Sequence, residues 1–320
     1  DPQDLYAQNH PLSKGSWADG MIHRQWAWGN GAATPSQKFC TNFYNRTLDA
    51  INRYNPDLIY FDVTAVPFYP VSDVGLKIAA HFYNHNMATH KGKLEAVMFG
   101  KILDENQRKG LVWDVERGAP NQIQETAWQS CSCIGGWHYN TSIYEYNGYK
   151  SAASVVKLLV DIVSKNGNLL LSVPLKADGS FDEKEEKILN EFGAWMDINK
   201  EAIYDTRPWK VFGEGPIAES DVKINAQGFN EDSYTHATAA EKRFTQTSKA
   251  LYVTMLAWPA EQKVTIKSLA LNNPLFQKKI SRVELLGYGK IPFKRTTEGL
   301  IVTLPAKRLN DIAPVIKIRK

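Results

Sequence analysis

The sequence predicts an α/β fold: the C-terminal portion of a (β/α)8-type barrel, followed by an antiparallel β-sandwich. Two observations predict this order. Up to residue 208, continuous apolar runs that are typical of strands buried on both faces alternate with amphipathic helical stretches. After Pro208, apolar and polar residues alternate with period two and turn signals recur about every 8–12 residues. We therefore assign residues 1–208 to a catalytic barrel portion and residues 209–320 to the sandwich.

The individual elements follow in order along the barrel portion. Residues 1–37 are rich in Gly, Asn, Pro and Trp without a sustained period, which predicts a loop insertion. A helix is predicted from Gln37 until Asn55-Pro56 stops it. The further predicted helices are 73–87, 151–167, closed by its glycine, and 182–198, and the predicted strands are 57–62, 95–100, 110–116, 128–134 and 168–175. The sandwich strands are predicted at 251–258, 263–269, 281–288, 299–305 and 314–320.

The barrel portion holds too few strands to close. A complete barrel needs eight strands in roughly 250 residues, whereas residues 1–208 show five clear ones behind the insertion. We therefore expect the first three strands, with the active-site residues that they carry, to lie upstream of Asp1 or on a separate piece. This missing N-terminal barrel segment is a predicted partner of the chain.

Composition excludes several classes of function. The net charge of +4 comes from 38 basic and 34 acidic residues without a basic run, which argues against a nucleic-acid partner. No apolar stretch approaches the ~20 residues of a membrane span. The three cysteines lack metal-site spacing, so we expect neither a metal nor a cofactor. Sequons at Asn45 and Asn140 weakly favour an extracellular, periplasmic or lysosomal location, although no signal peptide is visible.

Two acids end predicted strands and suggest catalysis. Asp62 closes the most apolar strand, and Glu116 ends another, two positions after Asp114. A retaining glycosidase needs two carboxylates about 5–5.5 Å apart, one that attacks the anomeric carbon and one that protonates the leaving oxygen. Because barrel active sites lie at the carboxyl ends of the strands, Asp62 and Glu116 could serve one pocket. The alternative is that each acid caps a loop or is solvated.

Five motifs in the same order identify a resemblance. NPDLIYFD, WDVERG, WQSCSCIGGWHY, NGNLLLSVPLKADGSFD and INKEAIYDTRPW resemble segments of the α-L-fucosidases of glycoside hydrolase family 29, over about residues 38–213. The resemblance implies a retaining exo-glycosidase that removes terminal α-L-fucosyl residues from oligosaccharides or glycoconjugates. It also implies an accessory β-sandwich after the barrel. In the family the nucleophile is the Asp that ends the first of these strands, which is Asp62 here.

The general acid/base is harder to carry across from the family. Many members have a Trp-Glu motif where this chain has Trp128-Gln129, and a glutamine cannot donate the proton. The nearby acids are Glu116, in the ERG segment where other members carry an acid, and Glu125, in a predicted loop. We predict Glu116 as the acid/base over Glu125. An ion pair with a neighbour such as Arg117 is the alternative role for Glu116.

Substrate-binding residues are predicted around these acids. Arg117 matches a family arginine that hydrogen-bonds the sugar hydroxyls, although a surface salt bridge would explain it as well. Trp137 and His138 follow the Gly135-Gly136 turn, where the family packs an aromatic residue near the fucose methyl group. Core packing would equally explain Trp137. In the insertion, Trp26 and Trp28, with His23, could shape a subsite for the rest of the glycan.

Two other functions stay open at this point. A related site could hydrolyse another α-L-sugar, such as an L-galactoside, because the two sugars differ only by a hydroxyl at C6. A non-catalytic carbohydrate-binding protein on a degenerate hydrolase scaffold would explain Gln129. The presence of both Asp62 and Glu116 argues against that second alternative.

Overall fold

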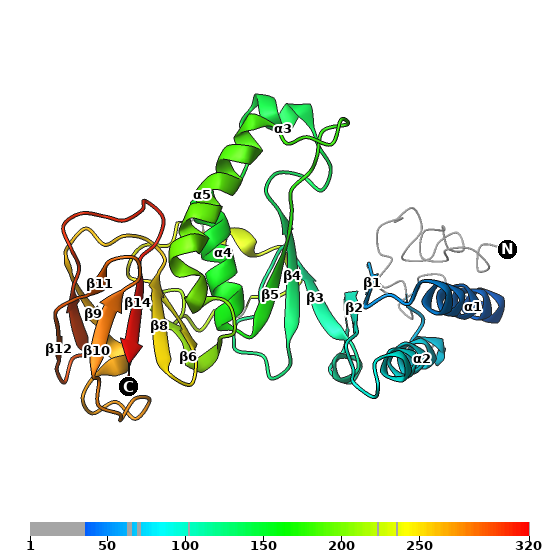
Figure 1. The fold of residues 1–320 in the computed structure, drawn as a ribbon, viewed down its shortest axis with the longest axis horizontal. Helices are drawn as coiled ribbons and strands as arrows, with labels where there is room; N and C mark the ends of the chain where they lie inside the picture. Colours follow the sequence, from blue (N-terminus) through cyan, green and yellow to red (C-terminus); the bar gives the residue numbers. More distant parts are fainter. Residues whose placement is uncertain are drawn as a thin grey trace. The chain divides into compact units, whose positions relative to one another are not determined.

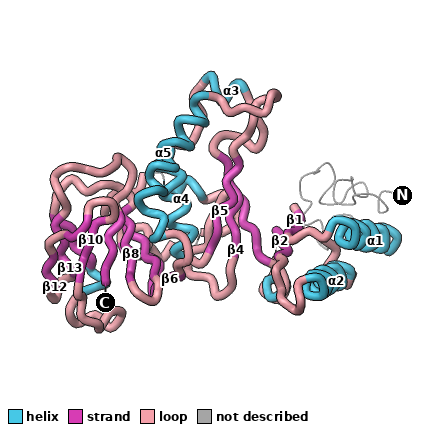
Figure 2. Tube along the Cα trace, viewed as in Figure 1, coloured by secondary structure: helices cyan, strands magenta, loops and turns pink. Residues whose placement is uncertain are grey.

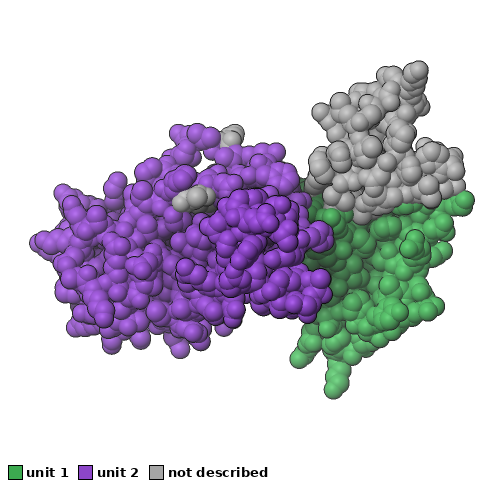
Figure 3. Space-filling model, turned by 90° about the horizontal axis from the view of Figure 1, so that it is seen from above, with its two compact units in different colours: residues 1–114 green, residues 115–320 purple. Residues whose placement is uncertain are grey.

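The computed structural model describes residues 36–62, 66–68, 72–101, 103–222, 224–234 and 236–319 (Figure 1). Five of the strands form a sheet in the order β1-β2-β3-β4-β5. The chain divides inside β3 into two compact units, residues 1–114 and 115–320, which Figure 3 colours green and purple. The sequence did not predict this division.

The first unit alternates helices with parallel strands. Its elements are α1 (Gln37–Tyr54), β1 (Leu58–Phe61), α2 (Val74–Thr89), β2 (Val97–Lys101), a 3-10 turn (Gln107–Lys109) and β3 (Val112–Glu116). Ser36 begins α1 by accepting a hydrogen bond from the Phe39 backbone, and Asn55 ends it in the left-handed conformation. β2 pairs in parallel with both β1 and β3. The helices and strands predicted for this stretch are confirmed within two residues or so at each end.

The second unit begins with the remaining parallel strands. Its first elements are β4 (Trp128–Cys133), α3 (Thr141–Glu145), α4 (Ala152–Ser164), β5 (Gly167–Ser172) and α5 (Glu183–Asn199). Ser151 caps α4, and Asp182 accepts from two backbone N–H groups at the start of α5. The predicted closure of α4 by Gly167 is wrong, because Gly167 begins β5. A Cβ there would lie 2.5 Å from the Trp128 ring, so packing against Trp128 requires this glycine.

Antiparallel sheets follow in the same unit. The strands are β6 (Arg207–Glu214), β7 (Lys242–Gln246), β8 (Ala250–Met255), β9 (Lys263–Ile266), β10 (Arg282–Leu285), β11 (Gly289–Lys290), β12 (Phe293–Arg295), β13 (Leu300–Thr303) and β14 (Val315–Arg319). They form a six-stranded sheet, β11-β10-β14-β8-β7-β6, and a three-stranded sheet, β12-β13-β9. Side chains of both sheets share one core, which includes Phe244, Val253, Ile266 and Val302. The predicted antiparallel C-terminal domain is therefore confirmed.

Sequence patterning missed β6 and β7. The charged residues Lys242 and Arg243 of β7 are both buried, so this strand shows no alternation of apolar and polar positions. In β6, Pro208 near the start and a register shift between Pro208 and Gly213 hide the period. Both strands depend on long-range contacts that a local pattern does not record.

Helix α4 joins the parallel strands to the antiparallel sheet. Figure 2 shows α4 and α5 between β5 and the strands β6 and β8. Asp161 of α4 lies 2.6 Å from Arg243 Nε of β7 and 2.7 Å from Lys165 Nζ, and all three side chains are buried. The second unit therefore has a charged core as well as an apolar one. In the part of the chain that the structure describes, no helix has the length and apolar character to cross a bilayer.

Candidate active site

Asp62 follows β1 directly and pairs with a buried lysine. Lys101 Nζ, at the end of β2, lies 2.7 Å from Asp62 Oδ1. The lysine side chain is 7% exposed, whereas that of Asp62 is 66% exposed. The ion pair directs the carboxylate, and the exposure leaves it accessible to a ligand.

A second contact defines the face of the sheet that carries Asp62. Tyr60 of β1 donates a hydrogen bond to Asp114 of β3 at 2.9 Å, across the intervening strand β2. Side chains two residues apart in a strand point to the same face, so Asp62 shares the face of Tyr60. Glu116 ends β3 two residues after Asp114 and shares its face by the same alternation. Asp62 therefore lies at the carboxyl end of β1, and Glu116 lies at the carboxyl end of β3.

The backbone turns sharply after Glu116. Arg117 has a φ of 48°, a left-handed conformation that is uncommon for a residue with a side chain. Its N–H donates to the carbonyl of Cys131 in β4, and its carbonyl accepts from the N–H of Glu231. The turn that carries Glu116 is therefore held from two sides.

Glu231 is the centre of a buried charge cluster on this turn. Its side chain is 1% exposed and lies 2.5 Å from Arg117 Nε and 3.0 Å from Lys150 Nζ. Ser132 of β4 donates to its other oxygen. Burial alone would raise the pKa of Glu231, but the hydrogen bonds from Ser132 and Arg117 and the charge of Lys150 outweigh it and lower the pKa. Glu231 is therefore a carboxylate at neutral pH.

The same charge cluster affects the pKa of Arg117. Burial would lower the pKa of Arg117, but the hydrogen bond and charge of Glu231 outweigh it and raise the pKa. Its side chain is 36% exposed. The structure thus places Arg117 in an ion pair with Glu231, and its predicted contact with sugar hydroxyls stays a prediction.

Glu125, the other candidate for the acid/base, and Gln129, at the family's acid position, both lie away from the end of β3. Glu125 precedes β4, and its carbonyl accepts a bond from Asn166, which precedes β5. It therefore lies at the amino ends of the parallel strands, opposite to the edge where β3 ends at Glu116. Gln129 is the second residue of β4 and is buried.

Two of the predicted substrate-binding residues, Trp137 and His138, lie in the part of the chain that the structure describes. Trp137 and His138 lie in the loop after the carboxyl end of β4, and both are exposed. Trp137, 40% exposed, is therefore not core filling. Trp26 and Trp28, like His23, lie outside the described residues.

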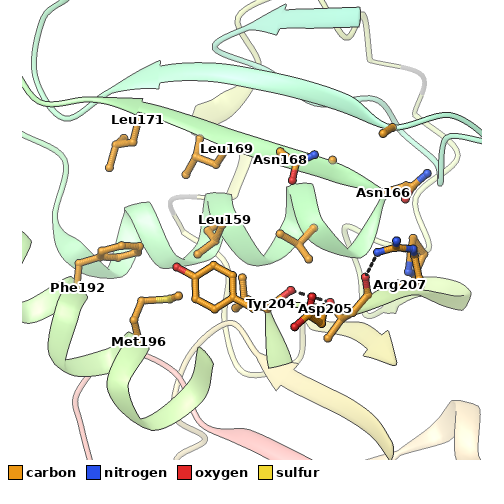
Figure 4. Close-up of a pocket in the computed structure, with 16 residues that line it drawn as sticks. Leu159, Asn166, Asn168, Leu169, Leu171, Phe192, Met196, Tyr204, Asp205 and Arg207 are labelled. Carbon is orange, nitrogen blue, oxygen red and sulfur yellow. Dashed lines mark hydrogen bonds between the residues drawn. The ribbon is translucent and has the colours of Figure 1, made fainter. Parts of the chain in front are cut away.

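A separate groove lies against β5, the last strand of the parallel sheet. It has a volume of about 720 Å³ and lies between β5, α4, α5 and residues 203–208. Leu169 and Leu171 point from β5 toward Leu159 of α4, and Phe192 and Met196 of α5 line the other side (Figure 4). None of the predicted catalytic residues lines this groove.

Sequence reasoning missed Lys101 and Glu231. A lysine at the end of an apolar strand is a signal that could have identified Lys101. Glu231 had no local signal, because it lies 114 positions from Arg117 in a segment between two antiparallel strands. Over the described stretches between residues 36 and 319, no three His, Cys, Asp or Glu side chains gather as metal ligands.

Sequence comparisons agree on one family. The family described as Alpha-L-fucosidase matches residues 9–201, and the Alpha-L-fucosidase C-terminal domain matches residues 235–319. The plasma alpha-L-fucosidase of Rattus norvegicus is 29% identical over 195 residues, which cover 59% of this chain and 37% of that protein. Its Homo sapiens counterpart is 27% identical over 202 residues, with 62% and 38% covered. The matched region thus spans under two-fifths of these relatives.

Solved structures share the fold. An alpha-fucosidase of Thermotoga maritima, in complex with a mechanism-based inhibitor, has a TM-score of 0.64 at 21% identity, covering 89% of this chain and 57% of that one. A Bacteroides thetaiotaomicron alpha-L-fucosidase, trapped as a covalent intermediate, has a TM-score of 0.62 at 17% identity, covering 89% and 63%. At these identities the likeness establishes the common architecture.

Proposed function

This chain belongs to the α-L-fucosidase family, and from this premise we propose that its protein hydrolyses terminal α-L-fucosyl residues from oligosaccharides or glycoconjugates. One observation carries the proposal further than family membership. The two proposed catalytic acids each stand at the carboxyl end of a parallel strand, Asp62 directly after β1 and Glu116 as the last residue of β3. Carboxyl strand ends are where barrel enzymes hold their catalytic groups.

We propose a double displacement for the reaction. Asp62 attacks the anomeric carbon, the glycosidic bond breaks, and the leaving oxygen takes a proton from Glu116. Glu116 then removes a proton from water, whose oxygen attacks the anomeric carbon and releases the Asp62 carboxylate together with fucose. The covalent intermediate trapped in the Bacteroides relative supports this course for the family fold.

Each role rests on the position of the residue. The accessible carboxylate of Asp62, directed by Lys101, suits a nucleophile. Glu116 suits the acid/base because its strand ends at the sheet edge used by barrel enzymes, whereas Glu125 lies at the opposite edge. We also propose that Arg117, Trp137 and His138 contact the sugar, and that Trp26 and Trp28 contact the rest of the glycan.

We propose further that a strand and helix from outside the described residues pack against β5. The described chain holds no strand beyond β5 in the sheet order, and Leu170 of β5 is 50% exposed. An exposed apolar edge strand normally pairs with another segment. The groove of Figure 4, which is lined by apolar side chains of β5, α4 and α5 and by polar residues at 166–168 and 205–207, offers a seat for the accompanying helix. This edge of the sheet is the place we propose for the further barrel strands that the strand count leads us to expect.

Matched relatives named plasma alpha-L-fucosidase support a location on the secretory route, which we propose for this protein. The sequons at Asn45 and Asn140 agree with it, since both asparagines are exposed. A glycosidase on that route would meet fucosylated glycoconjugates.

One observation favours a different function. Gln129 stands where many relatives carry an acid, which would fit a carbohydrate-binding protein that has lost catalysis. An assay decides between these readings. The full-length protein should hydrolyse an aryl α-L-fucoside and release α-L-fucose first, as detected by NMR. Faster hydrolysis of the matching L-galactoside would change the substrate, and binding without turnover would favour the non-catalytic function.

A further inference from the structure

The segment from Asn225 to Glu231 joins the antiparallel sheet to the turn that follows β3. In sequence it lies between β6 and β7, two strands of the six-stranded sheet. Its side chains and backbone nevertheless contact residues 116–119. The C-terminal part of the chain therefore reaches the proposed acid/base, Glu116.

Hydrogen bonds connect the 225–231 segment to successive residues of the turn. Gln227 accepts a bond from the backbone N–H of Glu116 at 3.4 Å, and the Glu231 N–H donates to the Arg117 carbonyl at 3.0 Å. Asn230 makes two bonds of 3.0 Å with the backbone of Ala119, one as acceptor and one as donor. Every residue from Glu116 to Ala119 except Gly118 is thus hydrogen-bonded to this segment.

Gly118 contacts the 225–231 segment by close backbone packing. A Cβ at this position would lie 2.3 Å from the carbonyl oxygen of Ala226, so the segment packs where only glycine fits. The close packing at Gly118 and the left-handed backbone of Arg117 each restrict the conformations that this turn can adopt. The turn is held in a conformation that it would not favour alone.

We propose that Glu231 is a positioning residue for catalysis, which holds the Glu116–Arg117 turn through its backbone bond and its ion pair. This inference rests on the proposed function, since it assigns Glu231 a task toward Glu116. Its buried carboxylate binds Arg117, Lys150 and Ser132 at once, so it ties β4 and the loop after it to the same turn. The antiparallel domain is then part of the catalytic apparatus.

The test compares leaving groups in the full-length protein. A misplaced general acid slows substrates with poor leaving groups more than activated aryl fucosides, which need little proton assistance. For Glu231→Gln we expect kcat/KM to fall by at least about tenfold more for poor leaving groups than for activated ones. Equal losses for both substrate classes would overturn the proposal.

Glu241→Gln is the matched control. Glu241 is also buried, but its described partners are the backbone N–H groups of Ile217 and Ala218 and the side chain of Arg243, all outside residues 116–119. We expect this variant to lose stability while keeping the ratio between the two substrate classes. A changed ratio in Glu241→Gln, equal to that in Glu231→Gln, would reduce Glu231 to a structural role.

A milder variant covers the case in which Glu231→Gln does not fold. Asn230→Ala removes the two bonds to Ala119 and one to the Asn225 carbonyl, and we expect it to change the ratio in the same direction by about threefold. An unchanged ratio would overturn the inference. Failure of the proposed function is distinguishable, because Glu116→Ala would then also lack the leaving-group dependence.

Discussion

Lys101 Nζ and Asp62 Oδ1, at the ends of neighbouring parallel strands, lie 2.7 Å apart. Lys101 is buried and Asp62 is exposed, so the buried lysine orients the accessible carboxylate. A nucleophilic carboxylate needs such direction, because a displacement of about 1 Å can cost on the order of a hundredfold in rate. Changing either residue of this pair should therefore affect turnover.

Replacing Asp62 by Ala should lower kcat by several orders of magnitude, because no group remains to attack the anomeric carbon. Added azide should partly restore turnover by attacking the open position, and the fucosyl azide product should be detectable by NMR. Asp73→Ala, an exposed acid at the start of α2, serves as the control and should stay active. Full activity of Asp62→Ala would remove this residue from the mechanism.

Lys101→Met should keep a flexible, unbranched side chain of similar length in the buried position while removing its charge. We expect kcat to fall about tenfold, far less than in Asp62→Ala, because the nucleophile is present but less well directed. Steady-state kinetics on an aryl fucoside measure this. A kcat equal to that of the unmodified protein would show that the ion pair has no catalytic role.

Glu116→Ala should slow hydrolysis of poor leaving groups by about a hundredfold or more, with a much smaller loss for activated aryl fucosides. The reason is that only the former depend on protonation of the leaving oxygen. Glu125→Ala should leave both substrates unaffected, because Glu125 lies at the amino ends of the strands. The reverse pattern, with Glu125→Ala impaired and Glu116→Ala normal, would transfer the acid/base role.

Asp161→Asn should destabilise the second unit by about 3–5 kcal/mol, because it leaves Lys165 and Arg243 buried without their shared carboxylate. Chemical denaturation followed by tryptophan fluorescence measures the free energy of unfolding. Asp49→Asn breaks an exposed pair with Arg53 and should cost less than about 1 kcal/mol. Equal losses in the two variants would contradict the importance of the buried cluster.

The same cluster predicts a pH dependence. Burial would raise the pKa of Asp161, but Lys165 and Arg243 outweigh it and hold the pKa below its ordinary value. A depressed carboxyl pKa stabilises the fold above the unfolded pKa, and this contribution is lost as pH falls through the folded pKa. The stability difference between the unmodified protein and Asp161→Asn should therefore be constant near neutrality and shrink below about pH 4. A stability difference that grows on acidification would contradict a lowered pKa of Asp161.

Local sequence patterns predicted most of the elements of the parallel sheet. Apolar runs such as residues 57–62 and 168–175 mark strands buried on both faces, and the period of 3.6 marks α1, α4 and α5. Capping residues such as Ser36 and Asp182 act within one turn of their helix, so the starts of α1 and α5 depend on local sequence. The strand-end positions of Asp62 and Glu116 followed from the same local signals.

Only the tertiary structure decided which distant residues support these acids. Lys101 reaches Asp62 because β1 and β2 pair in register, and Glu231 reaches Arg117 across 114 positions of sequence. The strand β7 was likewise invisible, because Lys242 and Arg243 are buried through partners elsewhere in the chain. Local preference specifies the elements, since it acts over a few residues, whereas buried charges are located by the partners that compensate their loss of hydration.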